Sequence, residues 1–178
     1  MELYVVRHGQ TSGNAERVID GSRRDTLLND IGVEQAHKTK EMLKDIKFDL
    51  IICSPLKRTI QTTNIINIDN VPVILEPRVI ERDCGEFAGK SYDSLDMNVY
   101  WNYYDKTQYE CVESLPDLFK RVYNYLDDIK DKYCDKRILI VSHGGVSKAI
   151  QCYFHGIPKD GDLYKIGLNN CEIAKYIL

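Results

Sequence analysis

The sequence has little of what marks several large classes of protein. Its 24 Lys and Arg residues are outnumbered by 27 Asp and Glu residues, which gives a formal net charge of -3. Proteins that coat nucleic acid or anionic membranes need a basic face. No apolar run approaches the length of a membrane-spanning helix. We therefore expect a protein that has neither nucleic acid nor membrane as a partner.

Paired cysteines are also missing. The six cysteines are spread almost evenly, at Cys53, Cys84, Cys111, Cys134, Cys152 and Cys171. Without a C-x-x-C pair, this spacing fits neither a zinc knuckle nor the dense disulfide pattern of a small secreted domain. The first residues lead directly into an apolar run, with no basic and apolar leader before it. The expectation is a reduced, cytoplasmic protein with no metal site.

What the chain does have is enough apolar sequence for one core. It is 178 residues long and 43% hydrophobic, which predicts a single domain over residues 1–178. Short β-branched runs alternate with segments of helical periodicity. This alternation predicts a mostly parallel sheet between helices, a three-layer α/β/α sandwich. Strands are predicted at about residues 3–6, 48–53, 71–75, 138–141, 164–168 and 172–178.

Helices are predicted between these strands, at about residues 31–46, 55–66, 115–130 and 146–155. Asn29 is placed to cap the first of them, and Pro55 suits the first turn of the second. The segment from Leu115 has the clearest amphipathic pattern. Gly156 is expected to end the last helix.

Two histidine-glycine junctions each follow a predicted strand. Arg7-His8-Gly9 follows residues 3–6, and His143-Gly144 follows residues 138–141. The carboxyl ends of parallel strands meet at the edge of the sheet where ligands bind, so one pocket is expected to hold both imidazoles. Either junction alone is more typical of a tight turn, but the two together favour nucleophilic histidine chemistry.

Two arginines have the chemistry of a phosphate clamp. The planar guanidinium group donates paired hydrogen bonds to phosphate oxygens and stays charged at any working pH. Arg7 adjoins His8, and Arg58 lies early in the helix that follows the second strand. Taken alone, Arg58 also fits an ordinary solvated helix residue. With a donor from His143, these residues predict a site where neutral His8 attacks phosphorus.

Four motifs follow one another along the chain: Arg7-His8-Gly9-Gln10-Thr11 with Asn14; Ser54-Pro55-Leu56-Lys57-Arg58-Thr59-Ile60-Gln61-Thr62; Glu81-Arg82-Asp83-Cys84-Gly85; and Ser142-His143-Gly144-Gly145. They occur in the order found in the histidine phosphatase superfamily, and the chain resembles its phosphoglycerate mutase-like branch over nearly its whole length. The resemblance implies a phosphomonoesterase of the acid phosphatase type that needs neither a metal nor a cofactor.

The resemblance also implies the role of each site residue. His8 carries the phosphoryl group as phosphohistidine, with Arg7, Arg58 and His143 around the phosphate, and Glu81 protonates the leaving group. Asp83 is close enough to replace Glu81, which could instead cap a loop or pair with its neighbour. The residues expected to bind substrate are Thr11, Asn14, Gly21, Ser22, Arg82 and Gly144. For Thr11 and Asn14 a role in a turn is the competing interpretation.

Residues 91–114 are the most unusual segment. They hold six aromatic residues without the periodicity of a core helix, where members of the family place a substrate-covering insertion. A satellite core under a long loop explains the same pattern equally well. Just before it, Phe87 leads to Ala88-Gly89, where the family usually has a glutamate-glycine pair. That departure puts substrate preference in doubt more than the chemistry.

Three functions remain open. We expect a phosphatase acting on a small phosphorylated metabolite. The alternatives are a cofactor-dependent phosphoglycerate mutase type of phosphoryl transfer and, less favoured, a phosphate-binding protein without turnover. Mutases that resemble this family are generally longer, with extra material that closes the site against water. No residue selects among sugar phosphates, phosphoglycerates, nucleotides and ribazole phosphate, or between a monomer and a homodimer.

Overall fold

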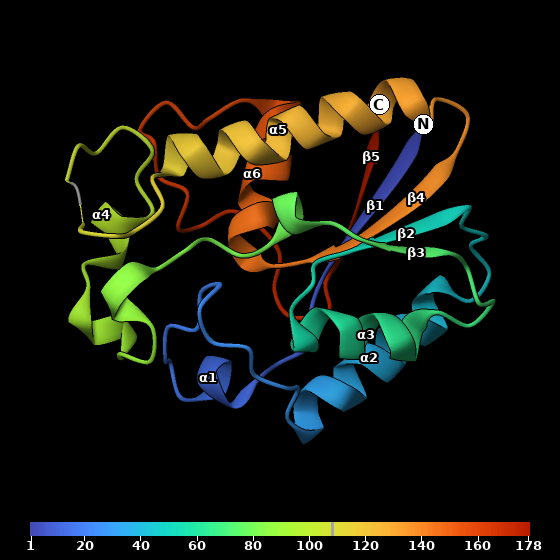
Figure 1. Cartoon of the computed structure of the whole chain (residues 1–178), viewed down its shortest axis with the longest axis horizontal. Helices are drawn as coiled ribbons and strands as arrows, with labels where there is room; N and C mark the ends of the chain where they lie inside the picture. Colours follow the sequence, from blue (N-terminus) through green and yellow to red (C-terminus); the bar gives the residue numbers. More distant parts are fainter. Residues whose placement is uncertain (108) are drawn as a thin grey trace.

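The computed structural model describes residues 1–107 and 109–178, and in this part of the chain a five-stranded sheet lies between two layers of helices (Figure 1). The strands are β1 (Glu2–Arg7), β2 (Leu50–Cys53), β3 (Val73–Leu75), β4 (Arg137–Ser142) and β5 (Ile173–Ile177). Their order is β3-β2-β4-β1-β5, and β5 alone pairs antiparallel. The predicted three-layer sandwich with a mostly parallel sheet is confirmed.

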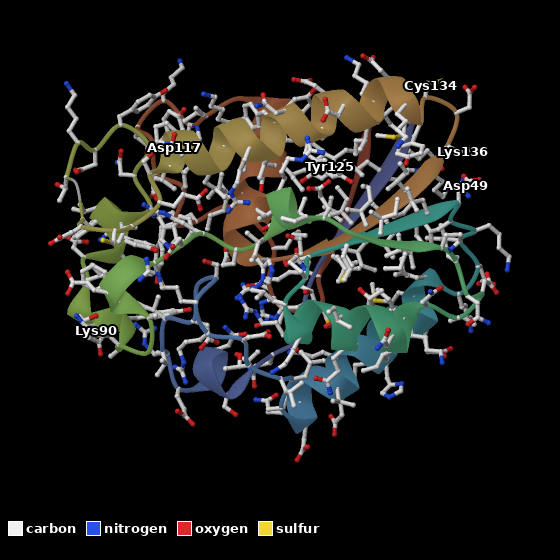
Figure 2. The ribbon with its side chains drawn as sticks, in the orientation of Figure 1. Asp49, Lys90, Asp117, Tyr125, Cys134 and Lys136 are labelled. Atoms are coloured by element: carbon white, nitrogen blue, oxygen red, sulfur yellow. The ribbon has the colours of Figure 1, made fainter. Side chains whose placement is uncertain are left out.

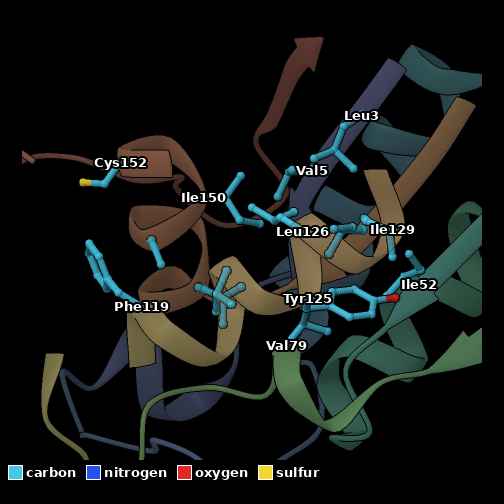
Figure 3. Close-up of a cluster of buried hydrophobic side chains, with 14 of the residues drawn as sticks. Leu3, Val5, Ile52, Val79, Phe119, Tyr125, Leu126, Ile129, Ile150 and Cys152 are labelled. Carbon is cyan, nitrogen blue, oxygen red and sulfur yellow. The ribbon is translucent and has the colours of Figure 1, made fainter. Parts of the chain in front are cut away.

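Helices cover both faces of the sheet. The layers consist of α2 (Asp30–Leu43) and α3 (Lys57–Ile66) on one face, and α5 (Leu115–Lys132) and α6 (Gly144–His155) on the other (Figure 1). Alternate strand residues serve the two layers. Val5 belongs to the cluster that contains Leu126 and Ile150 of α5 and α6 (Figure 3), whereas Val6 packs in the cluster with Leu43 of α2. Burial on both faces explains why the strands are apolar throughout.

The predicted strand over residues 164–168 is wrong. Lys148 of α6 is buried beneath this segment, and its ammonium group donates to the carbonyls of Leu163 at 2.6 Å, Tyr164 at 3.3 Å and Ile166 at 2.5 Å. Carbonyls that converge on one ammonium cannot form a ladder with a neighbouring strand. Gly167, with φ of +92°, completes the turn.

Helix ends also differ from prediction. α3 begins at Lys57, so Pro55 precedes the helix instead of lying in its first turn, and α2 ends at Leu43. α6 begins at Gly144, two residues earlier than predicted, with His143 as its N-cap. Its early start leaves the amide N–H of Gly145 free of a helical partner, and that group is used in the site.

The loops at the carboxyl ends of the parallel strands gather at one end of the molecule (Figure 1). They carry α1 (Ser12–Ala15), α4 (Met97–Tyr100) and the 3-10 turns η1 (Pro77–Val79), η2 (Gly85–Phe87) and η3 (Tyr92–Ser94). Asp49 and Lys136, which pair at 3.2 Å, lie at the opposite end from Lys90 (Figure 2). Among the described helices, none is both long enough and apolar enough to cross a membrane.

Candidate active site

His8 and His143 lie side by side where β1 and β4 end. The two strands pair in register up to Arg7 and Ser142, so the residues that follow are level. The imidazole centroids are 5.2 Å apart, and the side chains are 3% and 0% exposed. The structure thus brings together the two histidines that sequence reasoning placed in one pocket.

The protonation of His8 is defined by its neighbours. Its Nδ1 lies 2.7 Å from the carbonyl oxygen of Gly9, which can only accept, so Nδ1 carries the hydrogen and donates. Nε2 then holds a lone pair, toward which Arg58 donates from Nε at 3.2 Å. Burial, followed by the charges of Arg58 and Arg7, lowers the pKa of His8 well below its ordinary value. The result is a neutral imidazole with its nucleophilic nitrogen beside two cations.

Arg58 is only 2% exposed, and two backbone carbonyls fix its guanidinium group. Its Nη1 donates to the carbonyl of Arg24 at 2.9 Å and its Nη2 to the carbonyl of Gly21 at 2.8 Å. Gly21 has a φ of +56° at this turn, a conformation that suits glycine. The contribution of Gly21 is therefore a backbone carbonyl that orients Arg58 at the cavity wall.

Arg7 has an unused donor. Its Nη1 donates to the carbonyl of Leu168 at 3.0 Å, whereas its buried Nε has no hydrogen-bond partner among the described residues. A buried donor without an acceptor is costly. An anion bound beside His8 would satisfy it.

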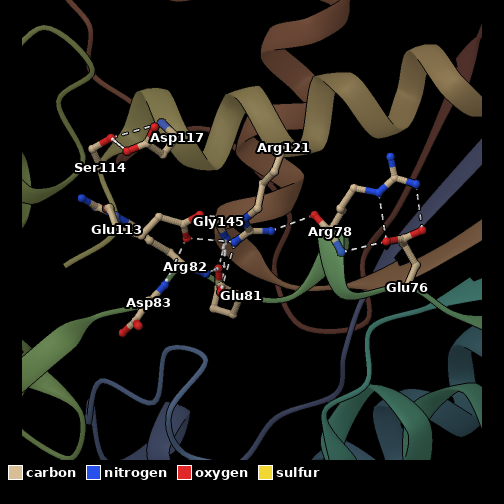
Figure 4. Close-up of polar contacts among 10 residues, drawn as sticks. All are labelled: Glu76, Arg78, Glu81, Arg82, Asp83, Glu113, Ser114, Asp117, Arg121 and Gly145. Atoms are coloured by element: carbon tan, nitrogen blue, oxygen red, sulfur yellow. Dashed lines mark hydrogen bonds and ion pairs between the residues drawn. The ribbon is translucent and has the colours of Figure 1, made fainter. Parts of the chain in front are cut away.

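Glu81 approaches the histidines from the segment after η1. Its Oε1 accepts from the amide of Arg82 at 2.8 Å and from the amide of Gly145 at 3.1 Å (Figure 4). A Cβ on Gly145 would lie 2.4 Å from that oxygen, so a side chain at this position would displace the carboxylate. Arg121 of α5 donates to the Glu81 carbonyl at 3.3 Å and pairs with Glu113 at 2.6 Å. Two backbone amides therefore position the Glu81 carboxylate, and Arg121 holds the backbone carbonyl of the same residue.

The site has a cavity of about 520 Å³, part of it open to solvent, and the buried His143 is not among the residues that line it. It is lined by Arg7, His8, Asn14, Ile19, Asp20, Gly21, Arg58, Glu81, Arg82, Tyr92, Met97, Tyr100 and Trp101. The polar groups surround His8. Four of the lining side chains, those from 92 to 101, come from the aromatic segment, so this part of residues 91–114 adjoins the site.

Some predicted substrate-binding residues do not line the cavity. Thr11 is buried, caps α1 and donates to Asp20 at 3.2 Å. Ser22 contributes a backbone bond from its amide to the carbonyl of Arg82. Gly144 opens α6 and is likewise absent from the lining. Asn14 does line it, and its Oδ1 accepts from Thr11, which leaves its amide donors for the cavity.

Arg82 lines the cavity but is occupied elsewhere. Its Nε donates to the carbonyl of Glu113 at 2.8 Å and its Nη1 to that of Tyr100 at 2.6 Å. The guanidinium carbon lies 4.1 Å from the centroid of the Tyr100 ring and 5.2 Å from that of Trp101. Arg82 thus anchors the aromatic segment.

The competing acid, Asp83, points elsewhere. It pairs with Arg23 at 2.6 Å near the surface and does not line the cavity. Of the two carboxylates considered for the proton transfer, Glu81 is the one that lines the cavity together with His8. His37 and His155 are exposed and lie outside the lining of the cavity.

Sequence reasoning did not assign several supporting residues. Thr62 accepts from the amide of Gly9 at 3.1 Å, and Asn170 donates to the carbonyl of His8 at 2.9 Å, so both hold the histidine loop. Ser54 contacts His143 at 2.7 Å. Ser54 and Thr62 lie inside a quoted motif, which was the available signal. Asn170 lies in a loop in which no sequence pattern indicated a role at the site.

Comparisons with known proteins identify the family to which the chain is similar. The family model described as histidine phosphatase superfamily (branch 1) matches residues 3–177. Phosphatase PhoE of Bacillus subtilis (strain 168), named as uncharacterized, is 33% identical over 149 residues, 83% of this chain and 74% of its own length. Phosphoglycerate mutase-like protein 4 of Arabidopsis thaliana is 35% identical over 159 residues, 84% of this chain and 69% of its own. The solved alpha-ribazole phosphatase from Shigella flexneri has a TM-score of 0.84 at 25% identity, covering 98% and 89% of the two chains.

Proposed function

The chain belongs to the histidine phosphatase superfamily (branch 1), and from this premise we propose that it hydrolyses small phosphomonoesters through a phosphohistidine at His8. One observation carries the proposal: a neutral, buried imidazole has an unprotonated Nε2, which accepts a hydrogen bond from Arg58, in a cavity that Arg7 also lines. That arrangement combines a nucleophile for phosphorus with charges that hold the phosphate oxygens.

In the first step the ester phosphate binds between Arg7 and Arg58. The unpartnered Nε of Arg7 gains an acceptor, and Arg58 donates its Nε hydrogen to a phosphate oxygen instead of to His8, which releases the lone pair on Nε2. Nε2 of His8 then forms a bond to phosphorus while the bond from phosphorus to the ester oxygen breaks. Fixed donors around the phosphoryl group stabilise its charge without reorganisation.

Glu81 serves both halves of the reaction. Protonated, it gives its proton to the departing alkoxide, which leaves as the alcohol. The resulting carboxylate then takes a proton from water as the water oxygen attacks the phosphohistidine and the bond from phosphorus to Nε2 breaks. Inorganic phosphate is released, and His8 is neutral again.

The first test is a screen of phosphorylated metabolites, with p-nitrophenyl phosphate as a generic ester. We expect phosphate release from part of the panel, at a rate that a chelator leaves unchanged, because the arginines supply the charge that a metal would otherwise provide. Full dependence on added magnesium would contradict the proposal. The same screen identifies the preferred alcohol.

A phosphoglycerate mutase type of transfer is the second candidate, because the relative from Arabidopsis thaliana bears that name. The two differ only in what attacks the phosphohistidine, water or a second hydroxyl group. Supplying 3-phosphoglycerate with catalytic 2,3-bisphosphoglycerate separates them. Free phosphate indicates hydrolysis, whereas isomerisation without free phosphate indicates a mutase.

Glu81→Gln is expected to slow turnover by a factor on the order of 10² for alkyl esters, whose alkoxides need a proton, and much less for p-nitrophenyl phosphate. Asp83→Asn is the matched control, because Asp83 pairs with Arg23 outside the cavity. The measurement is kcat/KM across esters of graded leaving-group pKa. Equal losses across the series for Glu81→Gln would remove it as the acid.

A further inference from the structure

The two ring nitrogens of His143 lie in different hydrogen-bonding environments. Nε2 lies 2.7 Å from the hydroxyl oxygen of Ser54, whereas Nδ1 is buried and has no hydrogen-bond partner among the described residues. Burial, with Arg58 and His8 nearby, lowers the pKa of His143 well below its ordinary value, so the ring is neutral and carries one hydrogen. Which nitrogen carries it decides what the ring offers a bound phosphate.

Ser54 is held firmly enough to determine which ring nitrogen of His143 carries the hydrogen. It follows β2, is fully buried, and its amide donates to the carbonyl of Val141 at 3.1 Å. Its own carbonyl accepts from the hydroxyl of Thr59 at 2.8 Å. Among the described residues, the Ser54 hydroxyl is recorded in no hydrogen bond except that with His143.

A buried hydroxyl needs an acceptor for its hydrogen. If Nε2 of His143 carried the ring hydrogen and donated to Ser54, the hydroxyl hydrogen would have no acceptor. If Nε2 accepts instead, that hydrogen is satisfied and the ring hydrogen lies on Nδ1. The second arrangement leaves one donor, Nδ1, in need of an acceptor.

The topology directs that donor toward the nucleophile. β4 lies between β2 and β1, so His143, at the end of β4, has Ser54 on one side and His8 on the other. The two ring nitrogens point in widely divergent directions. With Nε2 turned toward Ser54, Nδ1 is turned away from it, toward the side on which His8 lies.

We propose that Ser54 is a positioning residue that holds His143 as the Nδ1–H tautomer, so that the ring donates a hydrogen bond to the phosphoryl group at His8. The inference rests on the proposed function for its last step, the use of the donor. In the opposite tautomer Nδ1 would present a lone pair to an anion, which repels it. The Ser54 hydroxyl thus decides whether His143 attracts or repels the phosphate.

The tautomer is measurable without any substrate. Long-range ¹H–¹⁵N spectra distinguish protonated from unprotonated ring nitrogens, and the chain has only four histidines to assign. The exposed His37 and His155 are identified by single substitutions. We expect protonated Nδ1 and unprotonated Nε2 for His143 at neutral pH. Ser54→Ala should move the hydrogen toward Nε2, the tautomer that free histidine prefers, and Ser54→Thr should restore Nδ1.

The kinetic readout follows the same series. Ser54→Ala should lower kcat/KM by about tenfold, the loss expected for one hydrogen bond to a charged group, and weaken inhibition by inorganic phosphate in parallel. Ser54→Thr should recover most of it. Thr63→Val is the matched control, because this buried hydroxyl contacts Cys53 at 3.2 Å and not a histidine.

The outcomes separate this inference from the proposed function. Protonated Nε2 in the unsubstituted protein, or the same tautomer with and without the hydroxyl, would overturn the assignment to Ser54. A shifted tautomer with unchanged kcat/KM would overturn the role in phosphate binding. No ester hydrolysis by the unsubstituted enzyme would overturn the proposed function and leave the tautomer assignment standing.

Discussion

His8→Ala is expected to lower kcat/KM for phosphomonoesters by a factor on the order of 10⁴ or more, because it removes the atom that bonds to phosphorus. The side chain is buried, with Nδ1 at the carbonyl of Gly9 and Nε2 at Arg58. His143, the other histidine of the site, is turned toward Ser54. The effect is measured with p-nitrophenyl phosphate, whose good leaving group isolates the nucleophilic step.

The matched control is His37→Ala, at an exposed position on α2. It should leave kcat/KM within about twofold, as for most surface changes. Acid quenching during turnover should trap an acid-labile phosphoenzyme in the unsubstituted protein and none in His8→Ala. A His8→Ala enzyme that keeps a tenth of the activity while remaining folded would contradict the phosphohistidine mechanism.

The main parts of this site were predictable because strand ends are predictable. Apolar β-branched runs located β1 and β4, and parallel pairing brings whatever follows each strand to one edge. His8 and His143 each follow such a run directly, so their proximity needed no long-range information. The position of Arg58 was predictable for the same reason, because it lies in the first turn of the helix that follows β2.

What the sequence missed depended on contacts that no local pattern encodes. Residues 164–168 have the composition of a strand, but their carbonyls accept from the buried ammonium of Lys148. Arg82 lines the cavity, and its guanidinium group also holds the carbonyls of Tyr100 and Glu113, a role that the sequence did not indicate. In both cases a cation binds backbone carbonyls from a different part of the chain, so the contact depends on tertiary packing.

The choice between Glu81 and Asp83 as the acid shows most clearly what local sequence patterns do not resolve. The two carboxylates are two residues apart, and only the family resemblance favoured Glu81 over Asp83. The structure separates them through partners that are distant along the chain. The amide of Gly145 donates to Glu81, and Arg23 forms an ion pair with Asp83. A glycine that donates its amide and leaves room for a carboxylate is visible only in the folded state.

The stability of the protein should fall steeply in acid because of the same two histidines. His8 and His143 have pKa values well below the ordinary 6.5 in the folded state, chiefly through burial. Below pH 6.5 the unfolded chain binds a proton at each of these residues and the folded chain does not, so the free energy of unfolding decreases as the pH falls. Above pH 6.5 neither state is protonated there and the contribution is constant. Between pH 7.5 and pH 5.0 the loss is at most about 2 kcal/mol per histidine, the limit set by a pKa of 6.5 in the unfolded chain.

Urea unfolding at both pH values measures this loss, and paired variants isolate it from the carboxylates. The double variant His8→Asn, His143→Asn retains no titrating group at these positions, so its free energy of unfolding should fall less than that of the unsubstituted protein over the same interval. The control, His37→Asn with His155→Asn, removes two exposed histidines and should follow the unsubstituted protein. Equal pH dependence in the two double variants would mean that His8 and His143 become protonated in the folded state, and a protonated His8 has no lone pair with which to attack phosphorus.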